Sequence, residues 1–150
     1  MTSWLASVLF VCVAAIALTF VPLFDLLAFE FAVAIGAVLA YVAGWRACAA
    51  ANRARRPEAA GMATLPGFPG AALARLLAAN LALCLFPLAI IAANSLRVPT
   101  CNWSEGLQFY LLFSVPGVLY GTTLGFALGL ATSTTRARLL FVAWSLLTYA

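Results

Sequence analysis

The chain has 150 residues, of which 66% are hydrophobic and 8% charged, and its formal net charge is +4. A soluble domain usually has about 25% charged residues, so this chain has too little polar surface to cover a soluble globule. The basic residues are all arginine and histidine is absent, which removes the commonest general base and the commonest metal ligand. The composition therefore predicts an integral membrane protein.

Five apolar segments follow one another along the chain. A helix that crosses about 30 Å of hydrocarbon needs about 20 mostly apolar residues, and the first four segments meet this requirement. The five segments cover residues 4–24, 29–51, 71–95, 107–131 and 139–150. The predicted fold is therefore all-α: a single polytopic transmembrane helix bundle with four complete helices and a truncated fifth.

The first segment has two interpretations, a retained membrane helix and a cleaved secretory signal peptide. Residues 1–4 carry no lysine or arginine, and the apolar run that follows is long for a signal peptide. We therefore favour a retained helix.

The fifth segment is too short to cross a bilayer, because twelve helical residues extend only about 18 Å. It also ends without a polar flank. We therefore expect the chain to be the N-terminal part of a longer protein that continues this helix.

Arginines gather on alternate connections between the apolar segments, as the positive-inside rule requires. This distribution predicts a cytoplasmic N-terminus, with Asp25 and Cys101 on the outer side. Because its basic residues are all arginine and it is rich in alanine, we expect a bacterial inner membrane. The arginines that define the topology are Arg53, Arg55, Arg56, Arg136 and Arg138.

The longest connection covers residues 52–70 and contains three prolines and three glycines, which oppose regular structure. We expect a flexible cytoplasmic connection whose basic end lies on anionic headgroups of the lipid bilayer. The arginines form no interleaved basic and aromatic face, so nucleic acid is not an expected partner.

Glycines recur at every fourth position of the segment 107–131, and a second row of small residues has the same spacing in the segment 29–51. The rows are Gly117, Gly121, Gly125 and Gly129, and Ala32, Gly36, Ala40 and Gly44. Glycine is about 1 kcal/mol less favourable than alanine in a helix, but it lets membrane helices approach closely. We predict a glycine zipper in which the glycine row packs on the second row. The alternative partner is a symmetric copy of its own helix in a homo-oligomer.

Polar residues are rare inside the apolar segments. Asn80 lies at the same predicted depth as Thr122 and Thr123. An amide at that depth seeks an interhelical partner, worth about 0.6 kcal/mol on average. We therefore predict a hydrogen bond from Asn80 to one of the two threonines.

Pro87 and Pro116 lie inside the third and fourth segments. Each removes a backbone hydrogen bond and is predicted to kink its helix. Two kinks at similar depth could frame a substrate cavity, because broken helices mark transporter sites. Prolines are also common in membrane helices without such a role, and the chain shows no inverted repeat, so we favour the structural interpretation.

Few residues suggest chemistry. Asp25 and Glu30 could form an acid–base pair, but they lie at a predicted turn where contact with water explains them. The cysteines form no C-x-x-C pair, and Asn102 begins a short N-x-S glycosylation pattern that often arises by chance. We assign no catalytic, cofactor-binding or metal-binding residue, and we expect that the chain is not an enzyme.

Two functions follow from these predictions. The first is a non-catalytic, multi-pass membrane module that anchors or assembles a larger membrane protein through the packing of its helices. The second is a helical subunit or portion of a small-molecule transporter or channel, which needs a polar or water-filled route between helices.

Overall fold

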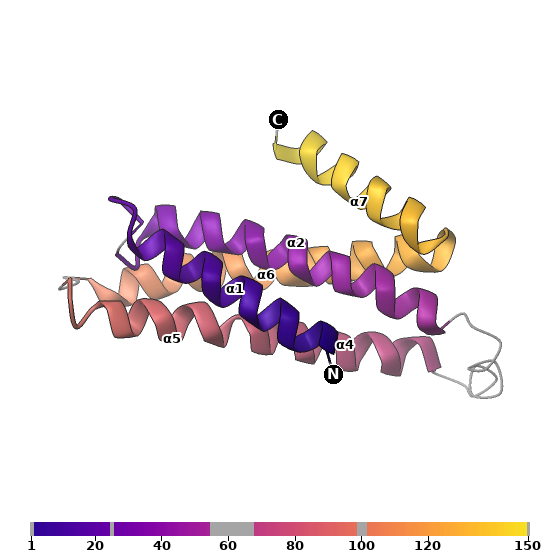
Figure 1. The fold of residues 1–150 in the computed structure, drawn as a ribbon, viewed down its shortest axis with the longest axis horizontal. Coiled ribbons are helices and arrows are strands. Elements are labelled where there is room, and N and C mark those ends of the chain that lie inside the picture. Colours follow the sequence, from indigo (N-terminus) through magenta and orange to yellow (C-terminus); the bar gives the residue numbers. More distant parts are fainter. Residues whose placement is uncertain (1, 25, 55–67, 99–101, 150) are drawn as a thin grey trace. The chain divides into compact units, whose positions relative to one another are not determined.

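The computed structural model describes residues 2–24, 26–54, 68–98 and 102–149. All regular structure in these ranges is helical, which confirms the all-α prediction (Figure 1). The helices are α1 (Thr2–Thr19), α2 (Phe29–Ala54), α4 (Phe68–Leu83), α5 (Leu85–Asn94), α6 (Trp103–Ala131) and α7 (Thr134–Tyr149).

Three of the helices are long and apolar enough to cross a membrane: α2, α6, and the run Gly70–Asn94 formed by α4 and α5. The apolar part of α1, Trp4–Thr19, is shorter. The first segment thus differs from its prediction, because its helix ends at Thr19 instead of continuing to residue 24. Pro22 disfavours helical backbone at the residue before it, and Leu23 has φ 78°, in the left-handed region that few non-glycine residues adopt.

The helices form two compact units. Unit 1 contains Met1–Ala40 and Leu81–Gly117, and unit 2 contains Tyr41–Asn80 and Val118–Ala150. The N-terminal parts of α2 and α6 therefore belong to unit 1 together with α1 and α5. Their C-terminal parts belong to unit 2 together with α7 and most of α4.

The core of unit 1 includes α1 packed against α5. An edge-to-face contact between Trp4 and Phe86, with ring centroids 6.1 Å apart, connects the start of α1 to α5. The other end of α1 is held by Arg97, which donates from Nη2 to the carbonyl oxygen of Thr19 at 3.0 Å. Its guanidinium also lies over the ring of Phe20. These contacts integrate α1 into unit 1.

The core of unit 2 includes two hydrophobic clusters, which use neighbouring faces of α2. In the first, Ala47 and Ala51 pack with Phe126 of α6 and with side chains of α4. In the second, Cys48 packs with Ala137 and Phe141 of α7. Because the α2 residues in these contacts are small, α4, α6 and α7 can all approach its backbone closely.

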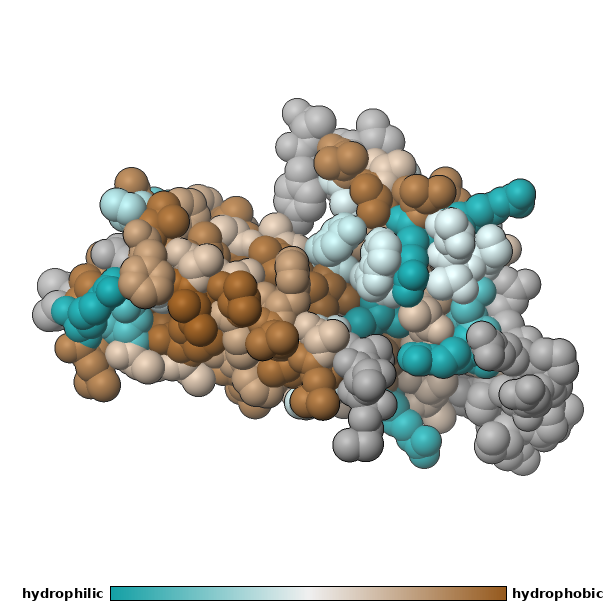
Figure 2. Space-filling model, viewed as in Figure 1, coloured by the Kyte–Doolittle hydropathy of each residue, from teal (hydrophilic) through white to brown (hydrophobic). Residues whose placement is uncertain are grey.

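The surface also differs along the chain. Hydrophobic side chains cover the visible face of α1, and hydrophilic side chains gather near α7 and the C-terminal end of α2 (Figure 2). In its described residues, unit 2 contains five arginines and no aspartate or glutamate, whereas unit 1 contains Glu30, Glu105 and Arg97.

Candidate functional site

Within unit 1, the small residues of α2 and α6 lie against one another. A Cβ added to Gly117 would lie 3.4 Å from the carbonyl oxygen of Gly36 and 3.5 Å from the Cβ of Ala40. A Cβ added to Gly36 would meet the backbone of Phe113 at 3.3 Å. The two helices are therefore close, but the space at Gly117 is just enough for a methyl group.

Within unit 2, the approach of the same two helices is closer. A Cβ on Gly125 would overlap the backbone of Gly44, with the Gly44 Cα at 2.8 Å. A Cβ on Gly129 would lie 2.7 Å from the Cβ of Ala51 and 2.8 Å from the carbonyl oxygen of Cys48. Because real Cβ atoms do not come this near to other heavy atoms, these two positions require glycine. Gly121, in the same row, is also buried.

Gly44 has a second close neighbour that the sequence did not reveal. An added Cβ would overlap the ring of Phe141, so Gly44 accommodates α7 as well as α6. Asn52 was also missed: its side-chain Nδ2 donates to the carbonyl oxygen of Gly129 at 3.2 Å and to that of Cys48 at 3.0 Å. In the sequence, this hydrogen bond between α2 and α6 is indicated only by the presence of an asparagine one turn after Cys48.

Asn80 is fully buried in unit 2. Its Nδ2 donates to Thr122 Oγ1 at 2.9 Å and to the carbonyl oxygen of Ala43 at 3.4 Å. The hydrogen bond expected from depth is thus present, and Thr122 is the acceptor. Thr123 is exposed and donates to carbonyl oxygens of its own helix. Asn80 therefore connects α4 with both α2 and α6.

The third apolar segment is interrupted at Cys84, between α4 and α5. Pro87 follows three residues later and is buried, and its missing N–H deprives the carbonyl of Leu83 of a helical partner. At the interruption, the Cys84 N–H bonds to the carbonyl oxygen of Leu81, three residues back, at 3.0 Å. This spacing is that of a 3₁₀ turn, which is tighter than an α-helical turn. Pro116 differs, because α6 continues through it without interruption.

Two polar side chains of α6 accompany this interruption in unit 1. The Tyr110 hydroxyl donates to the carbonyl oxygen of Cys84. This bond gives the carbonyl a partner at the point where the regular helical hydrogen bonds are interrupted. Ser114, one turn further along α6, is fully buried, and its Oγ has no hydrogen-bond partner among the described residues. The sequence predicts the kink at Pro87. It does not indicate the roles of Tyr110 and Ser114, because neither residue is unusual in an apolar helix.

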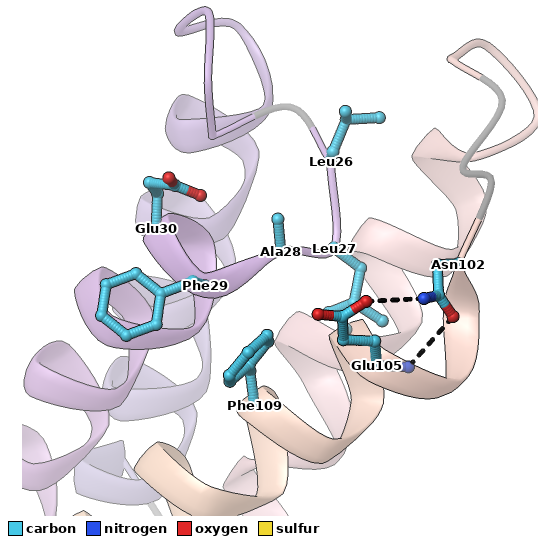
Figure 3. Close-up of a pocket in the computed structure, with 9 residues that line it drawn as sticks. Leu26, Leu27, Ala28, Phe29, Glu30, Asn102, Glu105 and Phe109 are labelled. Carbon is cyan, nitrogen blue, oxygen red and sulfur yellow. Dashed lines mark hydrogen bonds between the residues drawn. The ribbon is translucent and has the colours of Figure 1, made fainter.

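A cavity of about 320 Å³ lies in unit 1 between the beginnings of α2 and α6 (Figure 3). Phe29 and Phe109 contribute aromatic walls, and their rings meet edge to face with centroids 5.8 Å apart. Glu30 and Glu105 also line the cavity. Glu30 is exposed, and Asp25 lies outside the described residues.

The cavity also shows what Asn102 does. Its Oδ1 accepts from the backbone N–H of Glu105 at 3.4 Å, and its Nδ2 donates to Glu105 Oε2 at 2.6 Å (Figure 3). An Asn before a helix accepts from a free N–H group at the helix start, and here Glu105 Oε2 holds the Asn102 side chain in place. This local pattern explains why α6 begins at Trp103, before the predicted residue 107.

The topology arginines have different surroundings. Arg53 and Arg136 are exposed, and Arg55 and Arg56 lie outside the described residues. Arg138 is half-buried, and its guanidinium carbon lies 4.3 Å from the centre of the Trp45 ring. No group of three or more cysteine and acidic side chains that could hold a metal is found in the described ranges.

The chain matches no protein-family model, no curated protein and no solved structure. Its function must therefore be argued from its own residues.

Proposed function

We propose that the chain is a non-catalytic, multi-pass membrane module whose role is to pack helices and thereby anchor or assemble a larger membrane protein. The observation that carries this proposal is the close approach of α2 and α6 in unit 2, where Gly125 leaves no room for a Cβ beside Gly44. In lipid there is little hydrophobic force between helices, so such close packing is a main source of association.

We further propose that α1 and α7 are embedded in the membrane beside the three long apolar helices. The 18 residues of α1 extend about 27 Å, close to the thickness of the hydrocarbon core. The excess of arginine in unit 2 supports a cytoplasmic location for the ends of α2 and α6.

The packing role is tested with Gly121→Leu and Gly125→Leu. Both variants should weaken assembly, measured as loss of the monodisperse detergent-solubilised protein and as faster proteolysis, because the added side chain separates α2 from α6. A matched control is Ala127→Leu, which places the same side chain at an exposed position of α6. If both glycine variants remain as stable as the parent and the Ala127 variant, packing through these glycines is wrong.

Leu124→Ile is a weaker control than Ala127→Leu. Leu124 lies off the glycine row, but it packs partly buried against the cluster of Cys48, Ala137 and Phe141. A swap that conserves volume usually changes stability by less than about 1.5 kcal/mol, so a small loss is expected there.

The orientation is tested by thiol labelling of intact cells. An impermeant reagent should reach Cys101 from outside. Cys48 is buried, so its failure to react would carry no information about sidedness. Arg53→Cys, at an exposed position near the end of α2, is a better inner reporter and should react only after lysis. The opposite pattern of labelling would reverse the orientation.

A transporter or channel role is the second candidate, and the interruption at Cys84 is the observation that favours it. Broken membrane helices supply free carbonyls to transported substrates, and here Tyr110 and the buried Ser114 accompany the break. Vesicles containing the purified chain distinguish the two roles. The packing module predicts no solute or ion flux above that of empty vesicles, whereas flux lost in Ser114→Ala would favour transport.

A further inference from the structure

The cavity between the beginnings of α2 and α6 in unit 1 combines two kinds of wall. The rings of Phe29 and Phe109 are nearly perpendicular, with an interplanar angle of 87°, so they form an aromatic corner. Glu30 and Glu105 line the same cavity with carboxylates, which Figure 3 shows above the two rings. The cavity volume of about 320 Å³ lies in the range of small-molecule sites.

The cavity can be reached from outside the protein. Glu30 and Glu105 are exposed, and Phe29 is 47% exposed. One side of the cavity is fixed, because a Cβ added to Gly106 would overlap the backbone of Leu27. This close approach holds the segment before α2 against α6. A ligand therefore finds accessible polar groups on a rigid support.

The carboxylate of Glu105 is held in place by the residue before its own helix. Its Oε2 accepts from Asn102 Nδ2 at 2.6 Å. Figure 3 shows the other carboxylate oxygen pointing away from Asn102, toward the side of the cavity where Glu30 lies. A carboxylate that is already ordered loses less conformational freedom when a ligand binds. Glu105 is thus a preorganised acceptor for a hydrogen-bond donor.

The charged groups of the cavity are negative. None of its nine lining residues is basic, and no basic residue occurs at Asp25 or at 99–101, which adjoin the lining segments in the sequence. Arg97 is engaged at the end of α1. Ammonium groups bind to carboxylates and to the faces of aromatic rings. We propose that this cavity binds a small organic cation, a primary ammonium that carries a short apolar group.

The two kinds of wall assign a part of the ligand each. The ammonium donates to the carboxylates of Glu30 and Glu105, and the apolar group packs against Phe29 and Phe109. A metal ion fits the cavity less well, because the described ranges contain no group of three or more cysteine and acidic side chains that could hold one. An uncharged apolar molecule would make no use of the carboxylates.

The experiment uses the purified full chain in an uncharged detergent and measures the binding of benzylammonium by saturation-transfer NMR, with protein-free micelles as the blank. Benzylammonium should bind saturably. Benzyl alcohol, which has the same ring without the charge, should bind more weakly. Glu30→Gln and Glu105→Gln should each weaken the binding of benzylammonium about threefold, the change expected when one exposed charged contact is lost. Glutamine keeps an acceptor for Asn102, so the start of α6 should be retained.

Glu58→Gln is the control for net charge, because Glu58 follows the C-terminal end of α2 in the sequence, whereas the cavity adjoins its N-terminal end. It should bind benzylammonium as the parent does. Phe109→Leu removes a ring but no charge and should weaken the binding of both probes.

The assignment is overturned if the parent shows no saturable binding, if both cavity glutamate variants bind benzylammonium as the parent does, or if Glu58→Gln loses as much as they do. Unchanged binding of both probes by Phe109→Leu would also overturn it. If benzyl alcohol binds as tightly as benzylammonium, the cavity is apolar without selectivity for cations and the proposal is wrong.

Discussion

The contact between α2 and α6 has a different character in the two units. In unit 1, a Cβ added to Gly117 would lie 3.4 Å from the nearest backbone oxygen. This is an ordinary van der Waals distance for a methyl group. In unit 2, the Gly44 Cα lies only 2.8 Å from where a Cβ of Gly125 would be. One sequence spacing therefore produces two degrees of closeness, and glycine is required only in the closer one.

The two units also stabilise their helices by different means. Unit 1 relies on large side chains, including the edge-to-face contacts of Phe29 with Phe109 and Phe113. Unit 2 relies on backbone approach between small residues, supplemented by the buried amide of Asn80. Among the paired small residues of α2 and α6, substitutions that add volume should therefore harm unit 2 most. Gly106 of α6 is a separate tight position in unit 1, because an added Cβ there would overlap the backbone of Leu27.

A large effect of a single added methyl group is expected at Gly129. The group would collide with the Ala51 Cβ and the Cys48 carbonyl oxygen, which are backbone or fixed atoms that cannot rotate away. Gly129→Ala should therefore lower the free energy of unfolding by about 2–3 kcal/mol, as overpacking does. Reversible unfolding in mixed micelles measures this value. A loss no greater than that of Ala127→Leu would show that the approach is looser than described.

Gly44→Ala should lower the free energy of unfolding by a smaller amount, about 1–2 kcal/mol, through its contact with α7. The added Cβ would overlap the ring of Phe141, and a ring at the end of a side chain can move. The double variant Gly44→Ala/Phe141→Leu should recover part of the loss, because the smaller side chain vacates the space. Additive losses in this double-mutant cycle would mean that the two residues do not interact.

Removal of the buried hydrogen bond in unit 2 should have a modest effect. Thr122→Val keeps the shape of the side chain but leaves Asn80 Nδ2 with only the Ala43 carbonyl oxygen. The expected loss is about 0.6 kcal/mol, the average for such bonds in membranes. Thr123→Val, at the exposed neighbouring position, should change the unfolding free energy less. Equal losses would assign the effect to the helix itself and not to Asn80.

The sequence predicted those features that depend on residue type and spacing. The apolar runs predicted an all-α fold. The four-residue spacing of small residues identified the rows that contain Gly36 and Gly117. Counting residues from the helix ends placed Asn80 at the same depth as Thr122. Each of these needs only the geometry of a single helix. The positions of the glycines could thus be found without knowing how the helices are rotated.

Other features depend on how side chains of different helices meet, and the sequence did not reveal them. The ring of Phe141 over Gly44, the bond from Asn52 to Gly129 and the seat of Arg138 on Trp45 all require the rotation and tilt of two helices. Helix ends were also displaced. The hydropathy of residues 134–138 is low, but α7 begins at Thr134, because polar residues can form the first turns of a helix.

The comparison of Gly125→Ala with Gly117→Ala tests the account most directly, because the same methyl group enters the same helix at two places. The unfolding free energy should fall by about 3 kcal/mol for Gly125→Ala. For Gly117→Ala it should stay within about 0.5 kcal/mol of the parent or rise, since alanine favours the helix. Equal losses at both positions, or no loss at Gly125, would contradict the closer approach of α2 and α6 in unit 2.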